Sequence, residues 1–309
     1  MKILVTGGAG FIGSHVVDKY IGKGYSVTIV DNLSTGKKEN VNNKADFFEY
    51  DIRSQLASEL IKQGSFDIIN HHASQIDVRK SVSDPAFDAD VNIIGLINLM
   101  QAAVSAKVKK VIFSSSGGTI YGECGKKPPN EKAAPDPLSP YGISKLSSEY
   151  YLRYYSAIHG VKFTILRYGN VFGPRQDPHG EAGVVAIFCK NFILNKPVNI
   201  FGNGLQTRDY VFVGDVAEAN LKAVSGADNQ IINIGTGKAA SVKMLYKEMT
   251  KAGGFKSNAV YKPARQGELF KSFLDIKKAD KLLNWKPKFD FAKGLSHTIS
   301  YFKGRIKQQ

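Results

Sequence analysis

Short apolar runs alternate with longer amphipathic stretches along the first half of the chain. The apolar runs are typical of buried parallel strands and occupy residues 2–6, 26–31, 47–52, 66–70, 108–114 and 162–167. Apolar side chains three or four positions apart predict helices over residues 12–22, 56–63, 85–105 and 141–159. Parallel strands need such helical crossovers. The pattern therefore predicts an α/β fold with a doubly wound parallel sheet.

The pattern changes in the second half. Residues 123–140 contain five prolines, which predicts a long loop. From residue 169 onward, Gly- and Asn-rich turns separate short strands and two or three helices. Residues 210–235 regain a strand–helix–strand pattern. We therefore expect a first domain over residues 1–168, to which residues 210–235 return, and a smaller C-terminal α/β domain over residues 169–309.

The composition favours a soluble globular protein. Of the 309 residues, 43% are hydrophobic and 22% are charged, which excludes disordered, collagenous and coiled-coil chains. Cys124 and Cys189 cannot form a disulfide framework or a zinc pattern, so we expect a reducing, cytoplasmic location and no metal. No secretory signal is visible, and the apolar stretch at residues 93–104 is shorter than the ~20 residues that span a bilayer. We therefore expect no membrane partner.

The formal net charge of +15 raises the question of a nucleic-acid partner. Residues 271–309 contain 10 Lys and Arg against 3 Asp and Glu, and so supply +7 of this charge. These cations alternate with apolar residues at helical spacing, as on the solvated face of ordinary helices. We therefore expect no nucleic-acid partner. Attraction of a polyanionic small molecule, or weak affinity for RNA, remains an alternative.

The first candidate site is a glycine-rich loop, TGGAGFIG at residues 6–13, between a predicted strand and a predicted helix. Glycines permit a tight turn and a close approach of the backbone to a pyrophosphate, which the helix N-terminus attracts. Asp31 ends the next predicted strand, where its carboxylate can bind an adenosine ribose and repel a 2′-phosphate. The loop therefore predicts a Rossmann-type domain that binds NAD rather than NADP.

The second candidate site is the pair Tyr141 and Lys145 at the start of a predicted helix. Their spacing places a phenol and an ammonium on one helix face. Because a free tyrosine has a pKa of about 10, nearby cations are needed to make it a base at neutral pH. We expect Lys145 and an oxidised nicotinamide ring to supply them. One of Ser114, Ser115 and Ser116, at the end of a predicted strand, could hold a substrate alcohol near this phenol.

With these motifs, the whole chain resembles the extended short-chain dehydrogenases/reductases, and within them the UDP-glucose 4-epimerase family. The matching segments are TGGAGFIG at 6–13, DNLSTG at 31–36, DI at 51–52, SSSGGTIYG at 114–122, YGISK at 141–145, LRYGNVFGPRQ at 166–176, QTRDYVFVGDVA at 206–217 and PARQGE at 263–268. Several of these motifs are shared among nucleotide-sugar enzymes, so they indicate the fold more firmly than the substrate.

The resemblance implies specific residues for the cofactor. The pyrophosphate of NAD would lie against Gly7, Gly10, Phe11, Ile12 and Gly13. The adenosine would contact Asp31, Asn32, Ser34, Thr35, Gly36, Asp51 and Ile52, and the nicotinamide end would contact Ala73, Asn92, Tyr141, Lys145 and Tyr168.

The resemblance also implies the reaction and its residues. Tyr141 would be the base, Lys145 its electrostatic partner and Ser116 the hydroxyl that holds the sugar, so that a transient 4-keto sugar forms and C4 is inverted. The UDP-sugar would contact Ser116, Tyr141, Asn170, Val185, Phe201, Arg208, Val242, Arg265 and Ser272. Related dehydratases need an acid beside the catalytic hydroxyl, and this chain has Gly117 there.

Three further expectations follow from the resemblance. The position of Ser272 gates the sugar pocket near C2 in this family, so a serine predicts that N-acetylhexosamine substrates are accepted beside UDP-glucose and UDP-galactose. A homodimer is expected through residues 92–106 and 142–159. His72 stands where relatives have an apolar residue, and we expect it to be neutral and packed near the cofactor. The alternatives are a UDP-glucuronate 4-epimerase and a non-catalytic relative that binds NAD or RNA.

Overall fold

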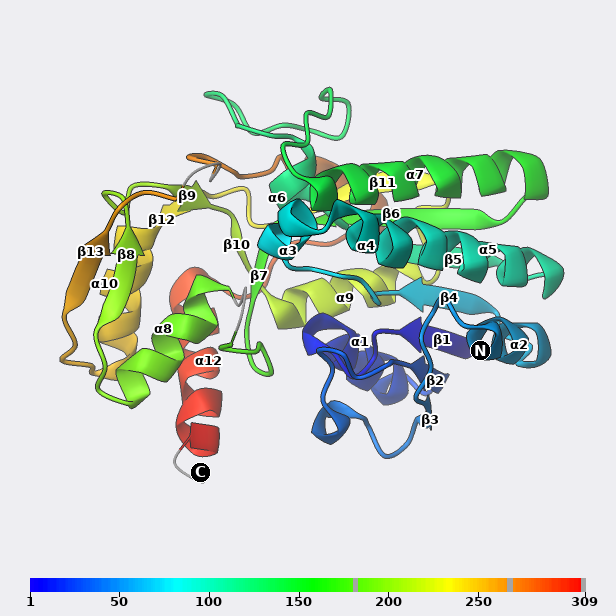
Figure 1. The fold of residues 1–309 in the computed structure, drawn as a ribbon, viewed down its shortest axis with the longest axis horizontal. Coiled ribbons are helices and arrows are strands. Elements are labelled where there is room, and N and C mark those ends of the chain that lie inside the picture. The colour runs from blue at the N-terminus through cyan, green and yellow to red at the C-terminus, as the bar shows by residue number, and fades with distance from the viewer. Residues whose placement is uncertain (180–182, 266–268, 307–309) are drawn as a thin grey trace.

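A seven-stranded parallel sheet forms the centre of the computed structural model, which describes residues 1–179, 183–265 and 269–306 (Figure 1). The strand order is β11-β6-β5-β4-β1-β2-β3, with all neighbours parallel. The strands are β1 (Lys2–Thr6), β2 (Ser26–Val30), β3 (Asp46–Phe48), β4 (Ile68–His71), β5 (Lys110–Ser116), β6 (Lys162–Tyr168) and β11 (Gln230–Ile234). The order reverses between β1 and β4, which is where open α/β sheets bind their ligands. The predicted Rossmann-type fold is confirmed.

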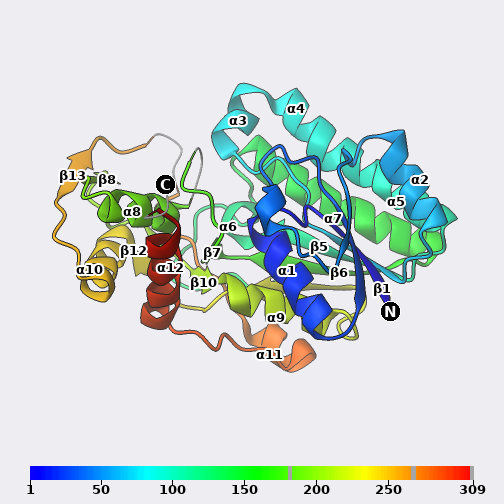
Figure 2. The same cartoon turned by 90° about the horizontal axis from the view of Figure 1, so that it is seen from below.

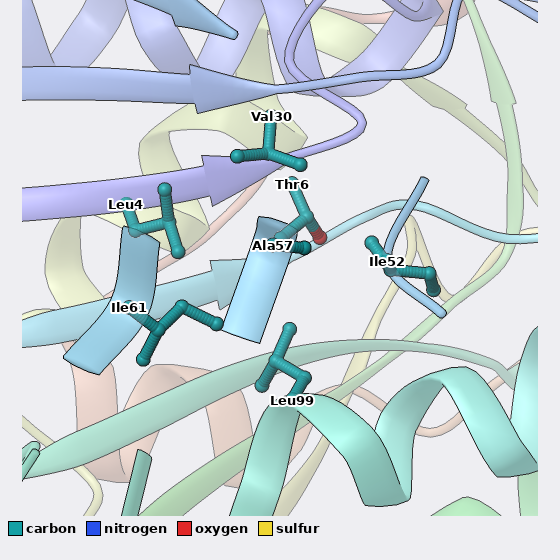
Figure 3. A pocket seen from close by; sticks show the side chains of 7 residues that line it. All are labelled: Leu4, Thr6, Val30, Ile52, Ala57, Ile61 and Leu99. Atoms are coloured by element: carbon teal, nitrogen blue, oxygen red, sulfur yellow. The ribbon is translucent and has the colours of Figure 1, made fainter. Parts of the chain in front are cut away.

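Helices cover both faces of this sheet. The helices on one face are α2 (Gln55–Gln63), α5 (Gly95–Ser105) and α7 (Pro140–His159), and those on the other are α1 (Phe11–Gly22), α9 (Val213–Ala223) and α11 (Lys277–Leu283). Successive side chains along each strand point to opposite faces of the sheet, so the core consists of two layers. Ile3 and Val5 pack on the α1 side, and Leu4 packs on the α2 side. Figure 3 shows Leu4 among the apolar side chains of that second layer, which leave no room for a water molecule.

One helical stretch, residues 85–105, is interrupted in its middle. It consists of α4 (Pro85–Ala89), a π-helical turn (Asp90–Ile94) and α5. Among the described residues it is the one helix long and apolar enough to cross a membrane by length and composition. Its side chains Leu96, Leu99 and Met100 are buried against the sheet, so in this fold it is a core helix.

The C-terminal part of the chain builds a second core beside the sheet (Figure 2). Its helices are α8 (Val184–Ile193), α10 (Val242–Gly253) and α12 (Phe291–Ile306). Its strands pair in twos: β7 (Asn170–Phe172) with β10 (Tyr210–Phe212), β9 (Thr207–Arg208) with β12 (Ala240–Ser241), and β8 (Val198–Phe201) with β13 (Ala259–Lys262). With α9 and α11, the described residues beyond 169 hold five helices rather than the two or three expected.

Two further boundaries differ from the expectation. Within residues 210–235, β11 joins the large sheet beside β6, whereas β10 pairs with β7 outside it. The strand predicted over residues 47–52 ends at Phe48, because the backbone then turns and the Asp51 carboxylate accepts a hydrogen bond from the Arg53 N–H. Short elements that the pattern did not reveal are α3 (Val78–Ser83), α6 (Gly117–Ile120) and a 3₁₀ turn (Lys38–Asn40).

Candidate active site

The glycine loop lies at the carboxyl end of β1 and opens directly into α1. Gly7 has φ +70° and donates its N–H to the Val30 carbonyl at 2.8 Å. A Cβ at Gly13 would lie 2.1 Å from the Gly7 oxygen, so only glycine lets the helix pack on the loop. The N-cap of α1 is Gly10, no side chain caps this end, and the first turn holds no acid. The first N–H groups are thus left to attract an anion, as the pyrophosphate of NAD requires.

Asp31 follows the carboxyl end of β2, as predicted. Its two carboxylate oxygens accept the N–H groups of Ala9, at 3.0 Å, and Leu33, at 2.8 Å. Burial raises the pKa of this carboxyl, and these backbone hydrogen bonds oppose the rise. A Cβ at Gly36 would lie 2.7 Å from the same carboxylate, so the backbone of Gly36 packs directly against it. Among the described residues, the segment around Asp31 contributes this carboxylate and has no buried Lys or Arg that could bind a 2′-phosphate.

A polar cluster forms the next part of the predicted adenosine site. Asp51 accepts hydrogen bonds from the Asn32 amide, at 2.9 Å, and from the Arg53 guanidinium, at 2.7 and 2.9 Å. Arg53 holds the pKa of Asp51 down at about 2. Arg53 also pairs with Asp90 in the π-helical turn. The Ile52 side chain is buried and lies against Gly95.

Tyr141 and Lys145 lie in the first turns of α7. Ser139 caps this helix by accepting the Gly142 N–H, and Pro140 occupies its first turn. The Lys145 ammonium is buried, donates to the Ser114 carbonyl at 3.0 Å and lies 5.8 Å from the centre of the Tyr141 ring. The backbone N–H of Tyr141 donates to the Ser81 hydroxyl of α3 at 3.2 Å. The fold therefore brings the predicted pair together against the end of β5.

Burial governs the protonation of both groups. It raises the pKa of Tyr141 well above its usual value, and the nearby carboxylate of Asp88 adds to the rise. Burial also lowers the pKa of Lys145 to about 8, against the opposing effect of Asp88 and Glu149. We expected Lys145 and an oxidised nicotinamide together to ease the ionisation of Tyr141. Burial acts in the opposite direction and raises the pKa of the phenol, so this expectation stays a prediction for the NAD-loaded enzyme.

The three serines at the end of β5 have different surroundings. Ser114 donates to the His71 carbonyl at 3.0 Å, and Ser115 donates to the Glu149 carboxylate at 2.6 Å. Among the described residues, the Ser116 hydroxyl has no hydrogen-bond partner. A Cβ at Gly118 would lie 3.9 Å from the Ser116 oxygen and 3.5 Å from the Asn170 side-chain oxygen. Ser116 and Asn170 therefore flank the same glycine.

Gly117, beside Ser116, packs against the Leu274 side chain of the C-terminal part of the chain. A Cβ there would lie 2.7 Å from the end of that side chain, so a larger residue would have to displace it. The position carries no acid of the kind that a nucleotide-sugar dehydratase needs beside the catalytic hydroxyl.

The predicted nicotinamide end contains Ala73, Asn92 and Tyr168. The Ala73 N–H donates to the Thr6 hydroxyl. The side-chain amide of Asn92 is hydrogen-bonded to residues 74 and 75 and to Asp88. The Tyr168 hydroxyl accepts a hydrogen bond from Asn220, and its ring is stacked on His72. Burial lowers the pKa of His72 to about 3, so the imidazole is neutral, as expected.

Apart from Ser116 and Tyr141, the predicted substrate residues lie in the C-terminal part of the chain. The Arg265 guanidinium lies 3.9 Å from the centre of the Phe201 ring. Arg208 precedes Asp209, whose carboxylate accepts the N–H groups of Thr236, Gly237 and Leu274. Ser272 is buried and donates its N–H to the Thr207 carbonyl at 3.1 Å. Val185 and Val242 are both buried in the second core, and residues 266–268 of the PARQGE motif lie outside the described residues.

The sequence did not reveal a buried polar network behind these residues. Arg167 forms two hydrogen bonds with Glu149, at 2.9 and 2.6 Å, and donates to the Tyr121 hydroxyl at 2.8 Å. Tyr121 in turn donates to the Asn233 side chain of β11. Asp88, which accepts hydrogen bonds from Ser144 and Asn92, was missed as well. No local motif marks either carboxylate, because Ser144, which bonds to Asp88, and Ser115 and Arg167, which bond to Glu149, lie far away along the chain.

Within the described residues, no group of His, Cys, Asp and Glu side chains is arranged to hold a metal.

Comparisons with known proteins agree with this geometry. Residues 3–235 match the pattern of the NAD dependent epimerase/dehydratase family. The UDP-glucose 4-epimerase of Mycolicibacterium smegmatis is 40% identical, over 99% of each chain. The solved UDP-glucose 4-epimerase of Thermotoga maritima with UDP-glucose is 49% identical, covers 99% of this chain and 100% of its own, and superposes with a TM-score of 0.97.

A Methanobrevibacter ruminantium UDP-N-acetylglucosamine 4-epimerase in complex with UDP-N-acetylmuramic acid is 35% identical. It covers 100% of this chain and 99% of its own, and superposes with a TM-score of 0.93. The chain therefore belongs to the NAD dependent epimerase/dehydratase family.

Proposed function

We propose that this protein is an NAD-dependent 4-epimerase of UDP-hexoses that interconverts UDP-glucose and UDP-galactose. The observation that carries the proposal is the buried pair Tyr141 and Lys145, held against the end of the strand that finishes at Ser116. Relatives named UDP-glucose 4-epimerase, similar over nearly their full length, support this choice of substrate.

The residues at the carboxyl ends of the strands have the chemistry that binding of NAD requires. Gly7, Gly10, Phe11, Ile12 and Gly13 would hold the pyrophosphate at the uncapped start of α1. Asp31, Asn32, Ser34, Thr35, Gly36, Asp51 and Ile52 would surround the adenosine, and Ala73, Asn92, Tyr141, Lys145 and Tyr168 would surround the nicotinamide. When bound, the oxidised cofactor supplies a hydride acceptor for C4 of the sugar and a hydride donor for the return step.

Tyr141 would remove the proton from the sugar 4-hydroxyl, while Ser116 donates a hydrogen bond that holds the same oxygen. Burial raises the pKa of Tyr141, and the positive charges of Lys145 and of the oxidised nicotinamide would oppose this rise and favour the phenolate. After rotation of the 4-keto sugar, Tyr141 would return the proton and C4 would be inverted without net oxidation.

The remaining site residues would hold the UDP group. Arg208 and Arg265 would pair with the diphosphate, since planar guanidinium groups match phosphate oxygens. Asn170 would add a hydrogen bond, and the Phe201 ring, beside Arg265, would pack on the uracil. Val185 and Val242 would contribute apolar walls.

The small side chain of Ser272 would admit an N-acetyl group at C2, so UDP-N-acetylglucosamine and UDP-N-acetylgalactosamine should be substrates as well. Ser272 is buried, and a larger residue would therefore fill the pocket rather than turn into solvent. We expect Ser272→Tyr to abolish turnover of UDP-N-acetylglucosamine and to spare UDP-glucose, as measured by coupled kinetics on both sugars. Loss of both activities, or of neither, would refute this gate.

The assembly and location belong to the same proposal. Residues 1–168, together with residues 210–235, would form the NAD-binding domain, and residues 169–309 would form the nucleotide-sugar-binding domain. A homodimer would form through residues 92–106 and 142–159, without a nucleic-acid or membrane partner. The two free, buried cysteines fit a reducing compartment, and we place the enzyme in the cytoplasm.

Proton NMR of UDP-galactose and, separately, UDP-N-acetylgalactosamine incubated with the protein tests the function directly. We expect both C4 epimers to appear in each reaction when NAD is present. Tyr141→Phe should lower turnover by about 10²-fold or more while the protein retains NAD, because only the proton transfer is lost. Conversion of UDP-glucuronate alone would point to a uronate epimerase, and near-normal activity of Tyr141→Phe would show that another group is the base.

A further inference from the structure

A second cavity lies along the outer edge of the sheet, away from the predicted site residues. Its volume is about 630 Å³, within the range of small-molecule sites. Its walls come from the proline-rich loop, α7, the first residues of β6 and β11, and the start of α11. The lining residues are Asn130, Glu131, Lys132, Arg153, Phe163, Asn229, Gln230, Ile231, Asp275, Lys277 and Lys278. None of them belongs to the proposed cofactor or sugar site.

Cations outnumber carboxylates in this cavity, and both carboxylates already have partners. Glu131 accepts the backbone N–H of Asn233 at 2.8 Å. Asp275 accepts the backbone N–H of Lys277 at 2.9 Å and pairs with the ammonium of the same residue at 3.4 Å. Among the described residues, Lys132, Arg153 and Lys278 have no carboxylate within ion-pair distance. With Lys277, the cavity therefore has four cations against two carboxylates, an excess of two positive charges.

Lys278 differs from an ordinary surface lysine because it is half-buried. Burial lowers the pKa of its ammonium, and the positive charges of Arg167 and Lys132 add to the lowering, against the effect of Glu131. Burial thus reduces the solvation of this ammonium. An anion bound beside it would replace part of the lost stabilisation of the positive charge.

We propose that this cavity is a binding site for a small phosphorylated molecule, of up to nucleotide size. The phosphate would lie between Lys278 and Lys132, with Arg153 at the rim, since compact ammonium groups and a guanidinium are the usual partners of phosphate oxygens. The Asn130 and Gln230 amides offer hydrogen bonds to the rest of such a ligand, and Phe163 and Ile231 provide an apolar wall. The site would explain part of the positive charge of residues 271–309, which the epimerase reaction does not use.

Calorimetric titration with inorganic pyrophosphate tests this proposal. For this titration the protein is loaded with NAD and saturated with UDP, which would occupy the proposed diphosphate-binding arginines. The measured heat then reports pyrophosphate binding at a second site. We expect saturable binding at 150 mM salt with one pyrophosphate per chain. Lys132→Glu and Lys278→Glu should each weaken it about tenfold or more, because each replaces a charge-assisted contact by repulsion.

Lys281→Glu is the matched control, since Lys281 is an exposed residue of the same helix α11, changes charge equally and does not line the cavity. It should leave the affinity unchanged. Equal weakening by Lys281→Glu, binding only at low salt, or binding unaffected by the two cavity variants would overturn the proposal in favour of diffuse electrostatic attraction. Retained NAD content and unchanged thermal melting in all three variants establish that they fold, whatever the epimerase activity.

Discussion

Neighbouring contacts give identical side chains different roles at the end of β5. Ser114 and Ser115 use their hydroxyls within the fold, on the His71 carbonyl and the Glu149 carboxylate. Ser116 keeps its hydroxyl free among the described residues and adjoins Gly118, where Asn170 approaches. The proposed assignment of Ser116 to the sugar therefore rests on its contacts rather than on its residue type.

This difference predicts different consequences for two serine-to-alanine variants. Ser116→Ala should lower kcat roughly 10²-fold, because the substrate hydroxyl loses the hydrogen bond that holds it for proton transfer. Ser114→Ala should leave kcat within a few-fold and cost about 1 kcal/mol of the free energy of unfolding, the usual effect of one hydrogen bond. Steady-state kinetics and chemical denaturation of both variants check this. Equal losses of kcat would contradict the assignment.

The buried Lys145 predicts a pH dependence. Its pKa is lowered to about 8, so the ammonium is charged below this pH and loses its proton as the pH rises through it. Because the charge stabilises the Tyr141 phenolate, kcat/KM should fall on the alkaline side, with a midpoint near pH 8. Lys145→Met should lose this limb and also about 10²-fold or more in kcat. Activity that stays constant to pH 10 in the wild-type protein would rule out this role.

At the scale of elements, α7 and β5 carry the proposed catalytic residues, and the segment after α6 connects them to the C-terminal part of the chain. The Glu123 carboxylate accepts the backbone N–H groups of Phe270, at 2.8 Å, and Lys271, at 2.6 Å. Cys124 donates its N–H to the Lys271 carbonyl. These bonds fix the segment that contains Ser272 relative to the strand that ends at Ser116.

Glu123→Gln tests this connection. The amide keeps one acceptor and replaces the other by a donor facing an N–H, so the 270–272 segment should shift. We expect KM for UDP-galactose to rise about fivefold, which corresponds to roughly 1 kcal/mol, with kcat and NAD content nearly unchanged. Glu59→Gln, on α2, is the control and should behave as wild type. A fall in kcat at constant KM would instead place Glu123 in the chemical step.

At the scale of the whole molecule, one helix face stands out on the surface. The outer side of α7 exposes large apolar side chains, namely Ile143, Tyr150, Tyr151, Tyr154 and Ile158. The exposed fractions of Tyr154 and Ile158 are 51% and 64%. Helix α5 lies beside α7 on the same face of the sheet (Figure 1), and the π-helical turn before α5 exposes Ile94. Such an apolar surface favours the proposed homodimer.

Light scattering after gel filtration measures this assembly. We expect the wild-type chain to have the mass of a dimer. The double variant with Tyr154→Glu and Ile158→Glu should be a monomer at micromolar concentration, because two buried carboxylates in each chain would oppose association. Leu56→Glu, at an equally exposed apolar position on α2, should remain a dimer. A monomeric wild-type protein would remove the basis of the dimer proposal.

Local patterns in the sequence predicted much of the fold and the core of the site. Three features could be predicted because each depends on residues close together in the chain. They are the alternation of strands and helices, the glycine loop, and Asp31 at the end of β2. The spacing of Tyr141 and Lys145 is likewise a property of one helix turn. Their environment could not be predicted from this spacing, because elements far apart in the chain bury Tyr141 and raise its pKa.

The sequence by itself determined the Rossmann-type sheet, the glycine loop and the spacing of the proposed catalytic pair, because hydrophobic period, turn geometry and helical spacing are local. Only the tertiary structure decided which side chains pair over long distances. Arg167 with Glu149, Asp88 with Ser144, and Glu123 with the segment before Ser272 are examples. The excess of cations over carboxylates in the cavity beside β11 is another. Such pairings and imbalances arise where chain segments far apart in sequence exclude water together, and no local pattern encodes that.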